Sequence, residues 1–319
     1  MTSLIGFSGF VGANLRTSVA FDNIYNSKTV TDVASRAHDM IVCAAAPATM
    51  WAANNDPAAD LANINRLIDA LRGVQADRFV LVSTIAVLAD ASAGYDEDSA
   101  QFETAKAYGA NRRHLELAVA GMFPDHLIVR LPALFGAGLK KNFLFDILNP
   151  APSFLAKARF DQVAGQLGAV QSAILRDVYA LNPALGMWEV SRTQLAECDP
   201  DGQLLHALEA LGATALGFTN PDSQYQYYDL SCLWEDIHSC INQDLRTIHL
   251  APEPLSAAEI YTALTGRTLA AGGPPAPYLE DMRTLHAALW GGPSGYISSK
   301  AQTLGQLQQF YAQAVAARS

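Results

Sequence analysis

The sequence opens with a short apolar run that leads directly into three evenly spaced glycines. Gly6 lies within the run, and Gly9 and Gly12 follow at intervals of three in the segment LIGFSGFVG. A glycine-rich loop between a strand and a helix turns tightly, and its backbone can approach a bound diphosphate at the helix N-terminus. The alternative interpretation is a tight turn that binds no ligand. Both interpretations require a strand, a loop and a helix in that order.

Apolar runs and amphipathic segments alternate through the first half of the chain. The expected strands cover residues 3–7, 24–25, 40–44, 79–82 and 126–131, and the expected helices cover residues 11–19, 60–71 and 111–119. Residues 79–82 are all aromatic or aliphatic, as in a strand buried on both faces. The alternation predicts an α/β fold, namely a Rossmann-like, doubly wound parallel sheet.

The second half has fewer strand signals. Residues 143–181 have a mostly helical pattern, and loop residues follow around Pro183 and Gly186. Later segments predict a strand at 225–228, a helix at 230–241, a strand at 247–250, a helix capped by Ser256 with Glu259, and a loop at Gly272–Pro275. We therefore expect a cofactor-binding domain of residues 1–142 plus about 223–252. Residues 143–222 and 253–319 would form a smaller, mostly helical substrate-binding domain.

Composition excludes several classes of protein. The net charge is −10 and only 16% of residues are charged, so the chain is too apolar for disorder and too acidic for general nucleic-acid binding. Residues 40–53, the longest weakly polar run, are too few to span a bilayer. Four cysteines without a CxxC pair and seven histidines without HxxxH predict no metal site. The start lacks the basic region of a signal peptide, so a cytoplasmic protein is expected.

The end of the second expected strand bears on the choice of dinucleotide. A carboxylate there would bond a ribose 2′-hydroxyl, whereas a basic group would favour a 2′-phosphate. This chain has Asn26, Ser27 and Lys28. Ser27 and Lys28 favour NADP over NAD, and the alternative is that they are solvated turn residues.

A hydroxyl, a phenol and a cation follow in a spacing that suits proton transfer. Thr84 lies just beyond the strand at 79–82, and Tyr108 and Arg112 are four residues apart on an expected helix. Because positions i and i+4 share a helix face, the cation would lower the pKa of the phenol. Thr84 could then hold a substrate carbonyl while Tyr108 transfers a proton. Alternatively, Thr84 caps a turn, Tyr108 packs, and Arg112 is solvated.

These segments resemble the extended short-chain dehydrogenases/reductases of the NAD-dependent epimerase/dehydratase type. The similar motifs are GFSGFVG, CAAAP at 43–47, VSTIAV at 82–87, YGANR at 108–112 and RLPALFGAG at 130–138. The resemblance implies that Thr84, Tyr108 and Arg112 match the catalytic Ser/Thr–Tyr–Lys set of the family. The implied cofactor-binding residues are Gly6, Gly9, Phe10, Val11, Gly12, Asn26, Ser27, Lys28, Ala44, Ala45, Ala46, Ser83, Tyr108, Arg112, Leu131 and Pro132.

Two departures from the family pattern stand out. Arg112 replaces a lysine that, in the family, holds the nicotinamide ribose and tunes the tyrosine, and arginine effectively never gives up its proton. The short link between Tyr25 and Met40 removes most of one βα unit. Dehydrorhamnose reductases and their relatives have a similarly short region, so the resemblance favours a reductase.

The substrate side follows the fifth expected strand. In the family this region lies beside a substrate that is often a nucleotide-activated sugar, whose diphosphate meets basic or amide groups. Thr84, Arg130, Lys140, Lys141 and Asn142 are the candidate substrate-binding residues. Lys140 and Lys141 could equally be an exposed basic pair before a helix. A homodimer is the family's common assembly.

Together these patterns predict an NAD(P)-dependent reductase or epimerase/dehydratase that acts on a nucleotide-activated sugar or a similar carbonyl or hydroxyl substrate. The alternative is an NAD(P)-binding member whose chemistry is weakened or lost because of Arg112. A scaffold that lost both sites is the least consistent with the glycine loop.

Overall fold

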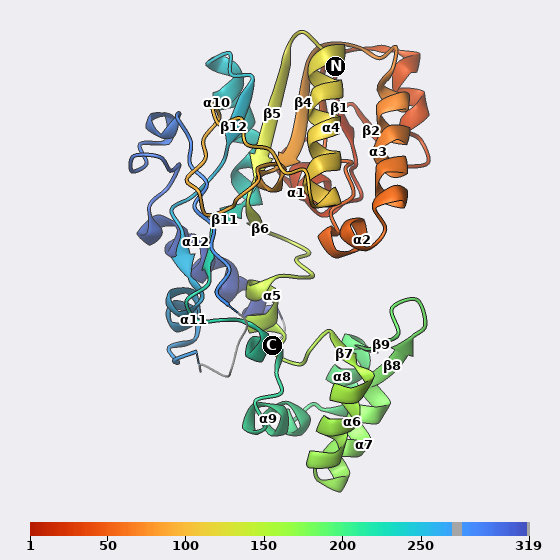
Figure 1. Ribbon diagram of the computed structural model, residues 1–319, viewed down its shortest axis with the longest axis vertical. Helices are drawn as coiled ribbons and strands as arrows, with labels where there is room; N and C mark the ends of the chain where they lie inside the picture. Colours follow the sequence, from red (N-terminus) through yellow and green to blue (C-terminus); the bar gives the residue numbers. More distant parts are fainter. Residues whose placement is uncertain (270–275, 318–319) are drawn as a thin grey trace. The chain divides into compact units, whose positions relative to one another are not determined.

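The computed structural model describes residues 1–269 and 276–317, which fall into two compact units (Figure 1). The first unit comprises residues 1–139, 224–255 and 279–307. The second comprises the described parts of 140–223, 256–278 and 308–319. The predicted loop at Gly272–Pro275 lies outside the described residues. That one domain binds the cofactor and the other the substrate stays a prediction.

The first unit is built on a six-stranded sheet in which all paired strands are parallel. The strands are β1 (Thr2–Ile5), β2 (Asn23–Tyr25), β3 (Ala37–Cys43), β4 (Gln75–Thr84), β5 (His126–Leu131) and β12 (Thr247–His249). Their order across the sheet is β12-β5-β4-β3-β1-β2. The predicted Rossmann-like α/β fold is confirmed.

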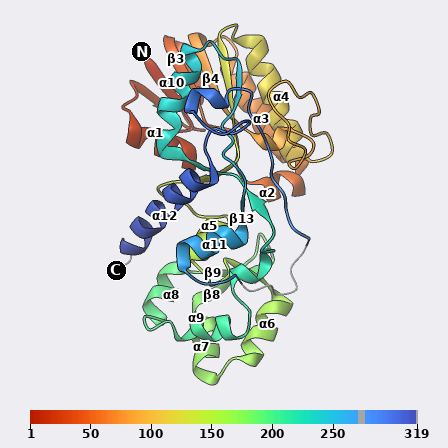
Figure 2. The same cartoon turned by 90° about the vertical axis from the view of Figure 1, so that its left-hand side faces the viewer.

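Helices cover both faces of this sheet, and β4 shows why. Val80 and Val82 pack into the core beneath α1 (Phe10–Ser18) and α10 (Leu233–Asn242). Phe79 and Leu81 pack on the opposite face, beneath α3 (Pro57–Leu71) and α4 (Ala107–Met122). Figure 2 shows the strands between these two helix layers. Because alternate side chains of a strand point to opposite faces, the continuous apolar run serves both cores.

The predicted short link between β2 and β3 is confirmed. Only a 3-10 helix, η1 (Val30–Ser35), lies between these strands, where a full helix and strand would otherwise fit. β2 and β3 pair with opposite sides of β1, so the chain reverses its direction of travel across the sheet at this point. Loops that leave the carboxyl ends of β1 and β3 therefore diverge, and such a point is where open α/β sheets bind ligands.

Shorter elements complete the first unit. They are α2 (Met50–Asn55), η2 (Ile85–Val87), β6 (Ala133–Phe135), β10 (Gln224–Tyr225), β11 (Tyr227–Asp229), η4 (Leu230–Cys232) and η5 (Ala287–Trp290). Two elements contain residues of both units, β13 (Leu255–Ser256) and α12 (Lys300–Ala316). Among the described residues, none of the helices combines the length and apolar character needed to cross a bilayer.

The second unit is mostly helical around a small antiparallel sheet. Its helices are α5 (Phe143–Leu148), α6 (Lys157–Gln166), α7 (Ala169–Val178), α8 (Arg192–Cys198), α9 (Gln203–Ala210), η3 (Ala215–Phe218) and α11 (Ala257–Thr265). The strands β7 (Phe154–Ala156), β9 (Met187–Val190) and β8 (Tyr179–Asn182) lie in that order across the sheet. The predicted capping box of Ser256 and Glu259 is confirmed at the start of α11.

The sequence did not predict the hairpin of β8 and β9. The Asn182 side chain accepts hydrogen bonds from the N–H groups of Ala184 (3.0 Å) and Leu185 (3.2 Å), which forms the turn. Trp188 on β9 then stacks on Phe160 with ring centroids 4.2 Å apart. The residues interpreted as a loop around Pro183 are therefore the turn of a hairpin that completes the core of this unit.

Candidate active site

The glycine loop joins β1 to α1 at the carboxyl edge of the sheet, and two of its glycines are sterically required. Gly6 has a φ of +91°, and a Cβ there would lie 2.5 Å from the Ala44 carbonyl oxygen. A Cβ on Gly12 would lie 2.2 Å from the Gly6 carbonyl oxygen. Both distances are shorter than any side chain tolerates, so these glycines allow β1, β3 and α1 to approach one another closely.

Gly9 differs because it is exposed and a Cβ there would fit without a clash. A Cβ there would come no closer than 3.4 Å, to the Gly6 carbonyl oxygen. Gly9 is the N-cap of α1, and the first helical hydrogen bond runs from Ala13 N–H to Gly9 O at 2.8 Å. The first turn therefore carries the N–H groups of Phe10, Val11 and Gly12, with no side-chain cap and no acidic residue. This arrangement suits an anion such as a dinucleotide diphosphate.

The turn after β2 lies beside this loop. Gly6 N–H donates to the Tyr25 carbonyl oxygen at 2.7 Å, and Lys28 N–H donates to Asn26 Oδ1 at 2.9 Å. Ser27 and Lys28 are exposed, and residues 26–28 carry no carboxylate. The Asn26 side chain thus shapes the turn, while the hydroxyl and the ammonium group remain accessible to solvent.

The other predicted cofactor residues lie at the same edge of the sheet, with different degrees of exposure. Ala44 N–H donates to Ile5 O at 2.8 Å, and the partly exposed Ala45 and Ala46 follow it. Leu131 ends β5 in the core, and the partly exposed Pro132 follows. The Ser83 hydroxyl instead donates to Glu116 Oε1 at 2.6 Å. The structure therefore places the Ser83 side chain in an internal hydrogen bond.

Thr84 and Tyr108 are brought together by a close approach of α4 to η2. A Cβ on Gly109 would lie 2.1 Å from the Ala86 carbonyl oxygen, so only glycine permits this contact. The Thr84 side chain lies near enough to the Tyr108 phenol to lower its pKa, and Thr84 Oγ1 accepts from Ala86 N–H at 3.2 Å. Asn54 Oδ1 on α2 accepts from Tyr108 N–H at 2.9 Å. The hydroxyl of the strand end and the phenol of the helix therefore meet at the carboxyl edge of the sheet.

An open cavity lies at the amino end of α4. Its lining residues 104–107 directly precede Tyr108 in the sequence. Its volume is about 420 Å³. It is lined by Asn54, Pro57, Thr104, Ala105, Lys106 and Ala107. Lys106, which lies outside the i+4 spacing from Tyr108, is exposed at the rim of this cavity.

Arg112 is buried, with only 2% of its surface exposed, so it is not a solvated helix charge. Its terminal nitrogens bind both oxygens of Asp60, with Nη1–Oδ2 at 2.5 Å and Nη2–Oδ1 at 3.0 Å. They also donate to the carbonyl oxygens of Tyr108 and Pro47. The guanidinium carbon lies 4.1 Å from the centroid of the Tyr108 ring. The guanidinium is thus held by α3 and the loop after β3 while it contacts the ring.

The pKa of Tyr108 lies above its usual value of 10. Burial raises this pKa, the Arg112 charge and the nearby Thr84 and Arg112 side chains lower it, and the Asp60 charge raises it. The phenol is therefore protonated at neutral pH. A protonated phenol beside a hydroxyl donor suits the delivery of a proton to a carbonyl oxygen.

Arg130, a candidate substrate-binding residue, is only 3% exposed. Its Nε and Nη2 donate to the two oxygens of Glu116 at 3.0 and 2.8 Å, and its Nη1 lies 3.1 Å from His249 Nε2. The structure therefore does not bring the Arg130 side chain together with Thr84 and Tyr108, because Glu116 and His249 hold it inside the fold.

The remaining substrate candidates belong to the second unit. Asn142 has a φ of 108°, and its side chain caps α5 by accepting from Phe145 N–H at 3.1 Å. Lys140 and Lys141 precede it, and partial burial lowers the pKa of Lys141. The Asn142 side chain therefore shapes the start of α5, and the substrate role of this segment stays a prediction.

Two residues of this region escaped the sequence interpretation. Asp60 lies on the buried face of α3 with Ile64 and Leu67, whereas the neighbouring Leu61 is 38% exposed. The spacing of Asp60 four residues before Ile64 was the available signal. Asn14 is buried on α1, where its Nδ2 donates to Ala137 O and its Oδ1 accepts from Ala137 N–H, both at 2.9 Å. No local pattern identifies Asn14.

Comparison with known sequences supports the resemblance in the first half of the chain. Residues 3–153 match the model of the NAD dependent epimerase/dehydratase family. This segment of the chain is therefore similar to that family. No curated protein sequence matches the chain.

Solved structures show the same fold over the whole chain. A dTDP-4-dehydrorhamnose reductase from Bacillus anthracis str. Ames in complex with NADP is 15% identical, with a TM-score of 0.61 over 98% of this chain and 97% of that one. A UDP-N-acetylglucosamine 4-epimerase from Methanobrevibacter ruminantium M1 in complex with UDP-N-acetylmuramic acid is 10% identical, with a TM-score of 0.62 over 99% and 98%. RMD from Pseudomonas aeruginosa complexed with NADPH is 14% identical, with a TM-score of 0.59 over 98% and 99%.

Proposed function

We propose that this protein is an NAD(P)-dependent reductase or epimerase/dehydratase that acts on a nucleotide-activated sugar or a similar carbonyl or hydroxyl substrate. The observation that carries the proposal is the meeting of Thr84 and Tyr108 at the edge of the sheet where the glycine loop opens. The substrate class is supported by relatives of the same fold, a dTDP-4-dehydrorhamnose reductase and a UDP-N-acetylglucosamine 4-epimerase.

Within this proposal, the reductive direction fits the site best. When bound, the nicotinamide cofactor supplies the hydride. Thr84 orients the substrate carbonyl, and Tyr108 donates its proton to the carbonyl oxygen and later regains one from water. The phenol suits this role because burial and Asp60 keep its pKa high, so the proton is present at neutral pH.

Two features of the chain itself fit a dinucleotide. The open backbone at Gly9 gives the diphosphate access to the first turn of α1. Arg112 Nε is buried and has no hydrogen-bond partner among the described residues, so it is a donor for a ribose hydroxyl at the position of the family's lysine. Ser27 and Lys28 favour NADP, as do two relatives with bound NADP or NADPH.

Lys140, Lys141 and Asn142 remain candidates for the diphosphate of the substrate, and a homodimer in the cytoplasm remains our expectation for the assembly and its location. These assignments rest on the sequence and the family resemblance.

A second candidate function is an NAD(P)-binding protein with weak or no catalysis. The observation that favours it is the engagement of Arg112, whose terminal nitrogens are taken by Asp60 and by two carbonyl oxygens. A lysine at this position would have a more mobile charge.

One set of titrations separates the two candidates. NADPH and NADH are titrated into the wild type, Gly9→Val and Tyr108→Phe, and turnover is followed with a panel of 4-keto-sugar nucleotides. We expect NADPH to bind more tightly than NADH, Gly9→Val to lose binding, and Tyr108→Phe to bind but lose turnover by about 10²-fold or more. Binding without turnover in the wild type would support the second candidate, and the absence of binding would contradict both.

A further inference from the structure

The ion pair of Arg112 and Asp60 is almost fully buried and joins two helices that already have an apolar contact. Asp60 is 5% exposed and Arg112 is 2% exposed. Ile64 on α3 and Leu115 on α4 lie in the same apolar core. Because a buried ion pair is often no more stabilising than an apolar pair of the same size, its presence beside Tyr108 calls for a second role.

The geometry fixes the orientation of the guanidinium. Asp60 binds both terminal nitrogens of Arg112, and Asn111 donates to Asp60 Oδ2 at 2.8 Å, so the carboxylate cannot turn freely. The bound guanidinium lies over the ring of Tyr108. A charge held in this way acts on the phenol from a constant position, while the negative charge of Asp60 offsets it.

From this arrangement we propose that Asp60 is a positioning residue that makes Tyr108 a proton donor, by holding Arg112 over the phenol and offsetting its positive charge. The inference rests on the proposed function and adds which residue keeps the Tyr108 phenol protonated. A carbonyl that takes hydride from a bound reduced nicotinamide needs one proton at its oxygen, and Tyr108 supplies it. The products are the alcohol, the oxidised nicotinamide and a tyrosinate that is reprotonated by water.

Among the groups around Tyr108, Asp60 is the negative charge that acts on the pKa of the phenol. Arg112 on the same helix is the positive charge that acts on the phenol, and Asp60 on α3 is the negative one. On the side of β4 and α2, the contacting groups are the neutral Thr84 hydroxyl and the Asn54 amide. Glu103 is occupied by the N–H groups of Ala105 and Lys106 at the start of α4, and the Lys106 side chain is exposed.

The test is the titration of the Tyr108 phenol in the protein without cofactor or substrate, followed by NMR of ¹³Cζ-labelled tyrosine. Tyr108→Phe identifies the signal. We expect Asp60→Asn to lower the phenol pKa by about one unit, which is a tenfold rise in tyrosinate at a given pH. The matched control is Asp69→Asn on the same helix, where the carboxylate forms an exposed pair with Arg72 and should leave the titration unchanged.

A double variant should shift the pKa of Tyr108 in the opposite direction. Asp60→Asn with Arg112→Gln removes both charges, and the pKa of Tyr108 should rise because the Arg112 contribution exceeds that of Asp60. This variant keeps the proposal testable if Asp60→Asn alone does not fold. Equal titrations for Asp60→Asn and Asp69→Asn, or a double variant whose pKa falls, would overturn the proposal.

The activity readout is separate from this titration. If the enzyme turns over, the kcat/KM of carbonyl reduction should fall at high pH as the Tyr108 phenol loses its proton. In Asp60→Asn this fall should begin about one pH unit lower than in the wild type, and an unchanged pH profile counts against the proposal. If no variant turns over while the phenol shifts as expected, the proposed function fails but the effect of Asp60 on Tyr108 stands.

Discussion

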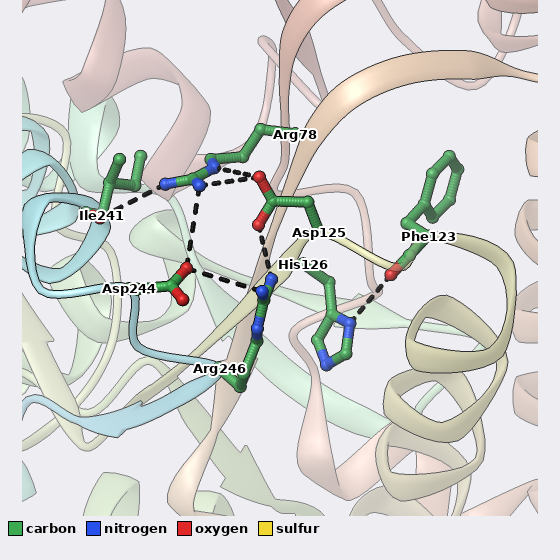
Figure 3. Close-up of polar contacts among 7 residues, drawn as sticks. All are labelled: Arg78, Phe123, Asp125, His126, Ile241, Asp244 and Arg246. Atoms are coloured by element: carbon green, nitrogen blue, oxygen red, sulfur yellow. Dashed lines mark hydrogen bonds and ion pairs between the residues drawn. The ribbon is translucent and has the colours of Figure 1, made fainter.

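The two edges of the central sheet carry arginine–aspartate clusters of similar composition in very different surroundings. At the amino edge, Arg78 and Arg246 both bind Asp125, and Asp244 lies within ion-pair distance of both arginines (Figure 3). Their side chains are 23–74% exposed. At the carboxyl edge, Arg112 and Asp60 are 2% and 5% exposed.

The comparison shows how solvent decides the role of an ion pair. Water screens the cluster at the amino edge, so its charges contribute little to stability. The pair at the carboxyl edge has lost its water, so each charge depends on the other and both act strongly on neighbouring groups. At the carboxyl edge, where open α/β sheets bind ligands, the Arg112–Asp60 pair is thus shielded from water.

The largest expected difference concerns the loss of one carboxylate from each cluster. Asp60→Ala should lower the free energy of unfolding by about 3–5 kcal/mol because it leaves Arg112 buried without its partner. Asp125→Ala should cost about 1 kcal/mol, since its partners are partly hydrated. Urea denaturation of both variants measures the difference, and equal losses would show that burial does not distinguish the two edges.

Glycines at the two edges give an intermediate effect. Gly12→Ala should destabilise the protein by about 2–3 kcal/mol, because its Cβ would lie 2.2 Å from the Gly6 carbonyl oxygen. Gly73, which precedes β4 at the amino edge, has a φ of +79°, but a Cβ there would meet no other atom within 4 Å. Gly73→Ala should therefore cost only the backbone strain, about 1–2 kcal/mol. A larger loss in Gly73→Ala than in Gly12→Ala would contradict the close packing of the carboxyl edge.

The smallest expected effect is the acid dependence of Asp125. Partial burial acts to raise its pKa, but hydrogen bonds from Arg78 and Arg246 outweigh it and hold the pKa below the usual 3.8. The folded state therefore gains stability from Asp125 above about pH 4 and loses it as the pH falls through the lowered pKa. In urea denaturation, the free energy of unfolding of the wild type should exceed that of Asp125→Asn by less than about 1 kcal/mol at pH 7. This difference should vanish near pH 3. A stability difference that grows in acid would show that the pKa of Asp125 is raised in the folded state, not lowered.

The sequence predicted those parts of the molecule that depend on neighbouring residues. All six strands of the central sheet overlap strands expected from the sequence, five of them in the first half of the chain and β12 at 247–250. The link between Tyr25 and Met40 was visibly too short for a βα unit. The spacing of Tyr108 and Arg112 on one helix was equally readable, because one turn of helix fixes it.

What the sequence did not predict depends on contacts between distant segments. Asp60 and Arg112 are 52 residues apart, and their pairing is decided by how α3 packs on α4. The burial of Arg130 follows from Glu116 and His249, which lie on a neighbouring helix and strand. The hairpin of β8 and β9 was missed because Pro183 and Gly186 indicate a turn without indicating what the turn connects.

The absence of a side chain at Gly109 allows the elements that carry two hydroxyl groups to approach each other closely. Because the backbone of α4 packs directly against the Ala86 carbonyl, the helix that carries Tyr108 is in close contact with the segment that follows Thr84. A single methyl group at residue 109 would push α4 away from the Ala86 carbonyl. The spacing of the two hydroxyls therefore depends on the lack of a Cβ at this position.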